Sequence, residues 1–210
     1  MPGLTAGELR AAVERGAVPL DLRPPESFAR GHIPGSLNVQ FGRHDLGERA
    51  RMFLPLDTPV AVVIEPDALG PAAEKLLGDQ GYQVVGYLKG GIKAWADAAF
   101  ELASMPVMRV EELRAALERG TGLAVVDVRE PFEYEYGHVP GAVNIPHGEI
   151  WKRSGEVEPE RPVAIICNDQ VRSGAAASVL RRIGLQNVAL VLGGTTAWAE
   201  AGYQLVRSSR

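Results

Sequence analysis

This sequence contains few cysteines and histidines, and its net charge is small. Its 210 residues include one cysteine and four histidines, and 22 basic residues oppose 26 acidic ones, which leaves a formal net charge of −4. A single thiol excludes an internal disulfide, and the scattered histidines argue against a zinc site, so we expect no metal and no cofactor. The weak negative charge argues against nucleic acid as a partner.

Long hydrophobic runs are absent as well. No apolar stretch approaches the roughly 18 residues of a membrane-spanning helix, and the first residues, Met1 to Thr5, lack the basic region and apolar core of a signal peptide. We therefore expect no membrane partner and a cytoplasmic location. Hydrophobic residues still make up 46% of the chain, which is ample for a buried core. Small molecules and other proteins are the expected partners.

An internal repeat divides the chain. The segment ELRAAVERG at 8–16 recurs as ELRAALERG at 112–120, and GHIPGSLNV at 31–39 recurs as GHVPGAVNI at 137–145. Repeats of this length and constant order indicate two homologous domains in tandem. We place the domains at 1–104 and 105–210.

Within each copy, short apolar runs alternate with segments of helical periodicity. This pattern predicts an α/β fold, in which each domain is a mainly parallel sheet with helices on both faces. In the second copy we expect a helix over 173–183 and strands over 124–128, 143–145, 163–167 and 188–192. Ligands of such sheets bind beyond the carboxyl ends of the strands. The only cysteine, Cys167, stands at such an end.

The segment 167–173 joins an apolar strand to a helix. Loop N–H groups and the positive end of the helix dipole would point at the Cys167 sulfur, and the Arg172 guanidinium could add a positive charge, so the thiolate would be favoured. A lone cysteine is otherwise more often an inert core residue. The strand, loop and helix around Cys167 favour a nucleophile, and this hypothesis requires the sulfur to face a cavity.

These features together resemble the rhodanese family of sulfurtransferases in a tandem two-domain form. The resemblance covers nearly the whole chain and is carried by DVRE at 127–130, GHVPGA at 137–142, the loop at 167–173, and Gly193-Gly194 followed by Trp198.

The resemblance implies an enzyme of the thiosulfate sulfurtransferase type. Cys167 would accept a sulfane sulfur from a small-molecule donor, thiosulfate or a persulfide, hold it as a persulfide, and pass it to an acceptor. The acceptor would be a thiol, cyanide or a protein. The catalytic residue would be Cys167, and the substrate-binding residues would be Asn168, Asp169, Gln170, Val171, Arg172 and Ser173.

The loop departs from the family pattern at two positions. Gln170 stands where glycine is common, so the backbone either differs locally or no longer requires a positive φ. Asp169 places a negative charge where an anionic donor would approach, and Arg172 is the only basic residue of the loop. Thiosulfate is therefore a poor expected donor, and a low-molecular-weight or protein persulfide is as plausible.

The first copy lacks the thiol. Ile64 occupies the position of Cys167, and Leu69 occupies that of Arg172. We expect the first domain to be non-catalytic. It either forms one wall of the second domain's cleft or contributes only stability.

Other polar residues have simpler interpretations. Asp127 and Arg129 recur as Asp21 and Arg23 in the copy without a thiol, so we expect a structural ion pair rather than acid–base catalysis. His138 recurs as His32, which predicts a turn histidine bonded to backbone. His44 and His147 receive no role.

Two other classes of function stay open. The first is a non-catalytic persulfide carrier or sensor, or a regulatory binding module. The second, less favoured, is a phosphatase or arsenate reductase. Related loops in those enzymes place one more residue between the cysteine and the arginine than this chain does.

Overall fold

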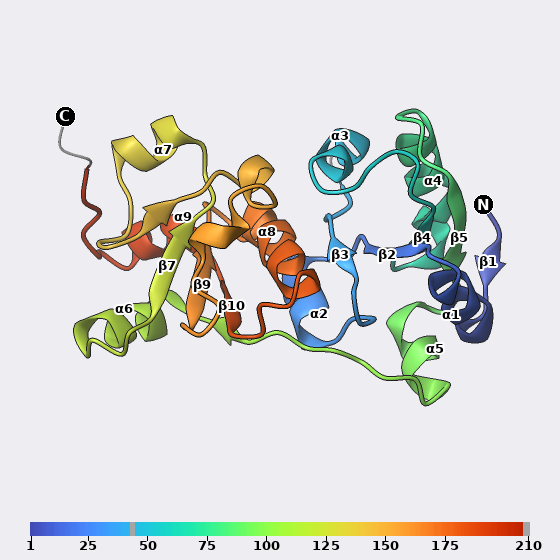
Figure 1. Cartoon of the computed structure of the whole chain (residues 1–210), viewed down its shortest axis with the longest axis horizontal. Coiled ribbons are helices and arrows are strands. Elements are labelled where there is room, and N and C mark those ends of the chain that lie inside the picture. The colour runs from blue at the N-terminus through green and yellow to red at the C-terminus, as the bar shows by residue number, and fades with distance from the viewer. Residues whose placement is uncertain (43–44, 208–210) are drawn as a thin grey trace. The chain divides into compact units, whose positions relative to one another are not determined.

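The computed structural model describes residues 1–42 and 45–207 (Figure 1), so His44 lies outside the described residues. The chain forms two compact units, Met1–Ser104 and Met105–Arg210. Each unit contains a five-stranded sheet in which every paired strand is parallel to its neighbour. The predicted α/β fold class, with two tandem domains, is confirmed.

The first unit has the strand order β1-β5-β4-β2-β3. Its strands are β1 (Gly3–Leu4), β2 (Val18–Asp21), β3 (Leu37–Asn38), β4 (Val60–Val63) and β5 (Val84–Leu88). Its helices are α1 (Ala6–Glu14), α2 (Pro25–Arg30), α3 (Leu46–Arg51), α4 (Gly70–Gly78) and α5 (Gly91–Asp97), with a 3₁₀ turn at Asp67–Leu69.

The second unit repeats this order as β6-β10-β9-β7-β8. Its strands are β6 (Val107–Met108), β7 (Ala124–Asp127), β8 (Val143–Asn144), β9 (Val163–Ile166) and β10 (Val188–Val191). Its helices are α6 (Val110–Glu118), α7 (Pro131–Tyr136), α8 (Val171–Arg182) and α9 (Gly194–Glu200), with 3₁₀ turns at His147–Glu149 and Ser154–Glu156.

The core of the second unit lies on both faces of its sheet. Ala164 and Ile166 of β9 pack in one cluster with Leu113 of α6 and Trp198 of α9. Because side chains alternate along a strand, Val163 and Ile165 face the other side, where α8 packs on β9 and β10. A central strand buried on both faces reads as a continuous apolar run, which is why the sequence of β9 contains no polar residue.

The predicted strands of this unit each extend one residue too far. β9 ends at Ile166 and β7 at Asp127, so Cys167 is the first loop residue rather than the last strand residue. Helix α8 begins at Val171 instead of residue 173 and ends before Ile183, whose side chain is exposed. The edge strand β6 was not predicted, because two residues are too few to show an alternation.

The ion pair expected in both copies is confirmed. Arg129 lies 2.6 Å from Asp127 through its Nη2 and also donates to the carbonyl of Gly137 at 2.8 Å, with the charged groups buried. Arg23 makes the same pair with Asp21 at 2.6 Å. The pair therefore anchors the segment after the strand in each unit, whether or not a thiol is present.

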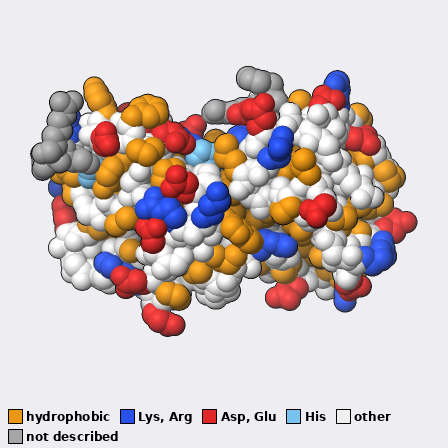
Figure 2. Space-filling view, turned by 45° about the horizontal axis from the view of Figure 1, so that its top comes forward, with side chains coloured by type: hydrophobic (Ala, Val, Ile, Leu, Met, Phe, Trp, Pro, Cys, Tyr) orange, Lys and Arg blue, Asp and Glu red, His pale blue; other side chains and the backbone are white. Residues whose placement is uncertain are grey.

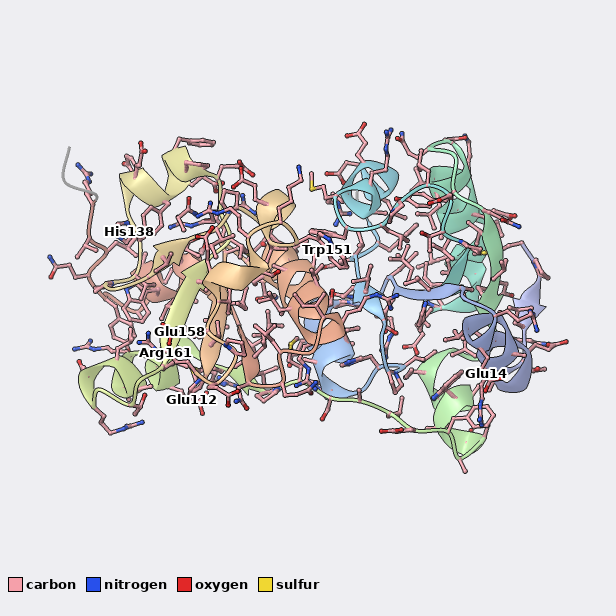
Figure 3. The ribbon with its side chains drawn as sticks, in the orientation of Figure 1. Glu14, Glu112, His138, Trp151, Glu158 and Arg161 are labelled. Carbon is pink, nitrogen blue, oxygen red and sulfur yellow. The ribbon has the colours of Figure 1, made fainter. Side chains whose placement is uncertain are left out.

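The turn histidines are likewise structural. His138 is labelled in Figure 3. Its Nδ1 lies 2.8 Å from the carbonyl oxygen of Tyr134, and the two rings stack. His32 makes the same contacts with Phe28. The prediction of a backbone-bonded histidine is confirmed in both copies. Over the described residues, no helix combines the length and the apolar character that crossing a membrane requires.

Candidate functional site

Cys167 begins the loop between β9 and α8, at the edge of the sheet where its parallel strands end. The sulfur accepts a hydrogen bond from the backbone N–H of Ser173 at 3.4 Å, and the Ser173 hydroxyl lies at the same distance. The Asp169 carboxylate is 3.9 Å away. Ser173 stands in the first turn of α8 and is fully buried. The start of this helix therefore presents both an amide and a hydroxyl to the sulfur.

The surroundings of the sulfur differ from the prediction in two respects. We expected several loop amides at Sγ, whereas among the described residues one, that of Ser173, makes this bond. We also expected an open sulfur, whereas the exposed fraction of Cys167 is 0%. The requirement that the sulfur face a cavity is therefore not met in this structure, and a donor reaches Sγ only if the covering atoms move.

Gln170 retains the left-handed backbone that glycine usually supplies here. Its φ is 73° and its ψ is −8°, so the suggestion that the loop no longer requires a positive φ is wrong. Its side-chain Oε1 accepts a hydrogen bond from the N–H of Gly193 at 2.7 Å, and its carbonyl accepts from Gly174 at 2.8 Å. A left-handed residue with a Cβ carries a strain of about 1 kcal/mol or more, and these bonds offset it.

Backbone N–H groups in the first turn of helix α9 hold the loop carbonyls. The N–H of Thr195 donates to the carbonyl of Cys167 at 2.7 Å, and that of Thr196 donates to the carbonyl of Asn168 at 3.3 Å. The Thr195 hydroxyl donates to the Asn168 side-chain oxygen at 3.0 Å. The glycine pair at 193–194 thus starts the helix that holds the loop carbonyls.

The Arg172 side chain is bound to a carboxylate that no local sequence pattern indicates, that of Glu133. Its Nη1 and Nη2 lie 2.6 and 2.8 Å from the two carboxylate oxygens of Glu133 in α7. The Asn168 side-chain amide donates to the same carboxylate at 2.9 Å. We expected Arg172 to add a positive charge at the sulfur, whereas among the described contacts its guanidinium forms a bidentate ion pair with Glu133.

This ion pair changes the titration of both partners. Hydrogen bonds from Arg172 lower the pKa of Glu133 from 4.5 to about 2, against the opposing effect of burial. The hydrogen bond with Glu133 in turn raises the pKa of Arg172 above its ordinary value. Glu133 also accepts from the backbone N–H of Glu130 at 3.0 Å, so one carboxylate caps α7 and holds the loop.

A comparison of the two copies could have revealed this partner. Helices α2 and α7 begin at Pro25 and Pro131, so Ser27 corresponds to Glu133. Leu69 corresponds to Arg172, as Ile64 does to Cys167. The copy without a thiol therefore lacks both members of the ion pair.

The equivalent loop of the first unit is built differently. Ile64 is almost fully buried, and the next residue, Glu65, accepts a hydrogen bond from the N–H of Ile92 at 2.8 Å through its side chain. In the second unit the corresponding amide, that of Thr195, binds the carbonyl of Cys167 instead. A side chain thus replaces the loop backbone as the partner of the supporting helix.

Comparison with known proteins identifies the family. The model of the rhodanese-like domain matches residues 5–98 and 109–201. The chain belongs to the rhodanese-like family. The resemblance inferred from the repeat, the loop and the paired motifs is confirmed, including the tandem form.

Several curated relatives of this rhodanese-like chain match about half of it. The uncharacterized protein YqhL of Bacillus subtilis is 36% identical over 103 residues, which are 49% of this chain and 79% of YqhL. The putative sulfur carrier protein YrkF of the same organism is 35% identical over 96 residues, 46% of this chain and 52% of YrkF. Thiosulfate sulfurtransferase GlpE of Pseudoalteromonas translucida is 36% identical over 81 residues, 39% of this chain and 76% of GlpE. Family and relatives together support sulfur transfer in general.

Proposed function

We propose that this rhodanese-like protein is a sulfurtransferase that carries sulfur as a persulfide on Cys167. The observation that carries the proposal is the position of the chain's only thiol. It begins the loop after β9, and its sulfur contacts the amide and the hydroxyl of Ser173 at the start of α8. The Ser173 amide and the start of α8 thus face the sulfur that would carry the transferred atom.

The proposed reaction has two displacements. The Cys167 thiolate attacks the outer sulfur of the donor, the donor's S–S bond breaks, and sulfite or a thiolate leaves with the electron pair. The enzyme then holds the persulfide anion, Cys167–S–S⁻. An acceptor nucleophile attacks the terminal sulfur, the new S–S bond breaks, and the Cys167 thiolate is restored.

The loop residues have separate parts in this proposal. The N–H of Ser173 binds Sγ, which becomes the inner sulfur of the persulfide. The N–H of Val171 is bound to Asp169, so the N–H groups of the other loop residues would bind the terminal sulfur. Arg172 and Asn168 fix the loop through Glu133. Asp169 is tied to the N–H of Val171 at 3.2 Å, which keeps its charge at the loop rim.

The acceptor comes from outside the chain, since there is no second cysteine to resolve the persulfide. A small thiol, cyanide or a protein nucleophile can take this part. We further propose that the first domain is non-catalytic, because Ile64 offers no nucleophile.

The test is intact-protein mass after exposure to thiosulfate and to a small persulfide, followed by cyanide. We expect wild type to gain one sulfur atom, lose it to cyanide as thiocyanate, and repeat the cycle. The Cys167→Ser variant should keep its circular dichroism spectrum and gain nothing. Full sulfur transfer by this variant would refute the assignment. A persulfide that forms but is not discharged would instead favour the carrier alternative.

A further inference from the structure

Glu133 compensates the only positive charge of the loop. The loop 167–173 contains two charged side chains besides the thiol, Asp169 and Arg172. The Arg172 guanidinium is held by both carboxylate oxygens of Glu133, with side-chain exposures of 22% and 18%. Counting Asp169 as −1, Arg172 as +1 and Glu133 as −1, these three groups sum to −1 before the thiolate is included.

An anionic donor must approach the net negative charge of these three side chains. Thiosulfate is a dianion and relies on uncompensated cations for binding. Two of the Arg172 N–H donors, one on each terminal nitrogen, already bind Glu133, and its carboxylate neutralises the guanidinium. On the face shown in Figure 2, acidic and basic side chains lie interspersed rather than in a continuous basic patch.

We propose that Glu133 is a positioning residue that sets donor specificity, by holding and neutralising Arg172 so that the site favours sulfur donors of low negative charge over dianions. This inference rests on the proposed sulfurtransferase function. The donor class it names is a singly charged species, such as a small alkyl persulfide.

The other copy of the domain supports a role specific to the thiol site. Glu133 could have served only to cap α7, but the corresponding helix α2 forms with Ser27 in its place. Leu69 replaces Arg172 where there is no thiol. Helix α2 therefore forms without this ion pair, and the pair occurs in the copy that carries the cysteine.

The experiment compares two donors that differ mainly in charge. Thiosulfate carries two negative charges. Methanethiosulfonate has the same tetrahedral central sulfur with a methyl group in place of one oxygen, and it carries one negative charge. Attack by Cys167 releases sulfite from the first and methanesulfinate from the second, with the same enzyme persulfide as product. The measured quantity is the ratio of kcat/KM for thiosulfate to kcat/KM for methanethiosulfonate, with cyanide as acceptor.

Glu133→Gln keeps the size and hydrogen-bonding oxygen of the side chain but removes its charge. We expect the ratio to rise about three- to tenfold, since one charge several ångströms away has an effect of this order in partly screened surroundings. The increase should shrink as ionic strength rises. A purely structural role would lower both rates together and leave the ratio unchanged.

Two further variants make the test decisive. Glu135→Gln removes the same charge from the same helix at an exposed position, and its ratio should stay within about twofold of wild type. The double variant E133Q/R172Q restores the net charge of wild type, so its ratio should return toward the wild-type value. This double variant also controls for loss of the ion-pair geometry.

The outcomes separate this inference from the proposed function. An unchanged ratio in Glu133→Gln, with both donors still turned over, would overturn the role of Glu133 and leave the sulfurtransferase intact. A ratio that rises equally in Glu135→Gln would also overturn it. Failure of wild type to form a persulfide with either donor would instead refute the sulfurtransferase itself.

Discussion

Gly194 lies directly against the backbone of Cys167. A Cβ atom at Gly194 would overlap the carbonyl oxygens of Cys167 and Asn168, and the φ of this glycine is +60°. The next amide, that of Thr195, donates to the Cys167 carbonyl at 2.7 Å. Close approach and a left-handed backbone therefore both require glycine where α9 meets the thiol loop.

Gly194→Ala should slow persulfide formation by about ten- to a hundredfold, because the new methyl group displaces the loop backbone by a fraction of an ångström or more. The measurement is the rate of sulfur gain by mass spectrometry. Gly91→Ala is the matched control, since it has a similar φ of +62° but its Cβ would meet the Glu65 side chain, which can move. Equal rates for the two variants would contradict this account of Gly194.

Substitutions at Gln170 separate backbone strain from the side-chain bond. Gln170→Gly relieves the left-handed strain but loses the bond to Gly193, so the free energy of unfolding should change by less than about 1 kcal/mol. Gln170→Ala loses the bond and keeps the strain, and should be less stable than the glycine variant by about 1 kcal/mol. Urea denaturation measures both. An alanine variant as stable as the glycine variant would show that the positive φ is not retained.

The Glu133–Arg172 pair should give stability a defined pH dependence. The folded state lowers the pKa of Glu133 from 4.5 to about 2, so its charged form stabilises the protein fully above pH 4.5. This contribution is lost as pH falls through the folded-state pKa of about 2. The stability difference between wild type and Glu133→Gln should therefore be constant near neutrality and shrink in acid. Thermal unfolding as a function of pH measures it, and a difference that grows in acid would contradict the pairing.

A thiol placed in the first domain should not acquire the proposed sulfurtransferase activity. In Ile64→Cys combined with Cys167→Ser, the new sulfur lacks counterparts of Arg172 and Glu133, and Glu65 binds the N–H of Ile92 beside it. We expect no stable gain of sulfur from thiosulfate or a small persulfide, measured as intact mass. Efficient sulfur gain at residue 64 would show that the fold alone, without the loop, suffices.

The sequence was enough to predict the domain architecture and the position of the thiol. The apolar run of β9 marks a central strand, and its end places Cys167 at the loop to within one residue. The buried Asp127–Arg129 pair could be assigned a structural role because the repeat preserves it without the thiol.

The contacts of the loop side chains could not be predicted in the same way. Arg172 and Glu133 are 39 residues apart, and no local pattern reports which carboxylate a guanidinium will reach. The positive φ of Gln170 was missed because its bond to Gly193 depends on how α9 packs beneath the loop. The burial of Cys167 has the same origin, since it depends on packing rather than periodicity.

The burial of Cys167 has a consequence for chemoselectivity. In the proposed persulfide, the added sulfur would lengthen the side chain by about 2 Å, so an incoming nucleophile would meet the transferable atom before it meets the buried Sγ. Attack on Sγ itself would expel hydrosulfide and leave a mixed disulfide, which ends the cycle. A covered Sγ would thus limit attack by acceptor thiols on this sulfur and so limit formation of the mixed disulfide.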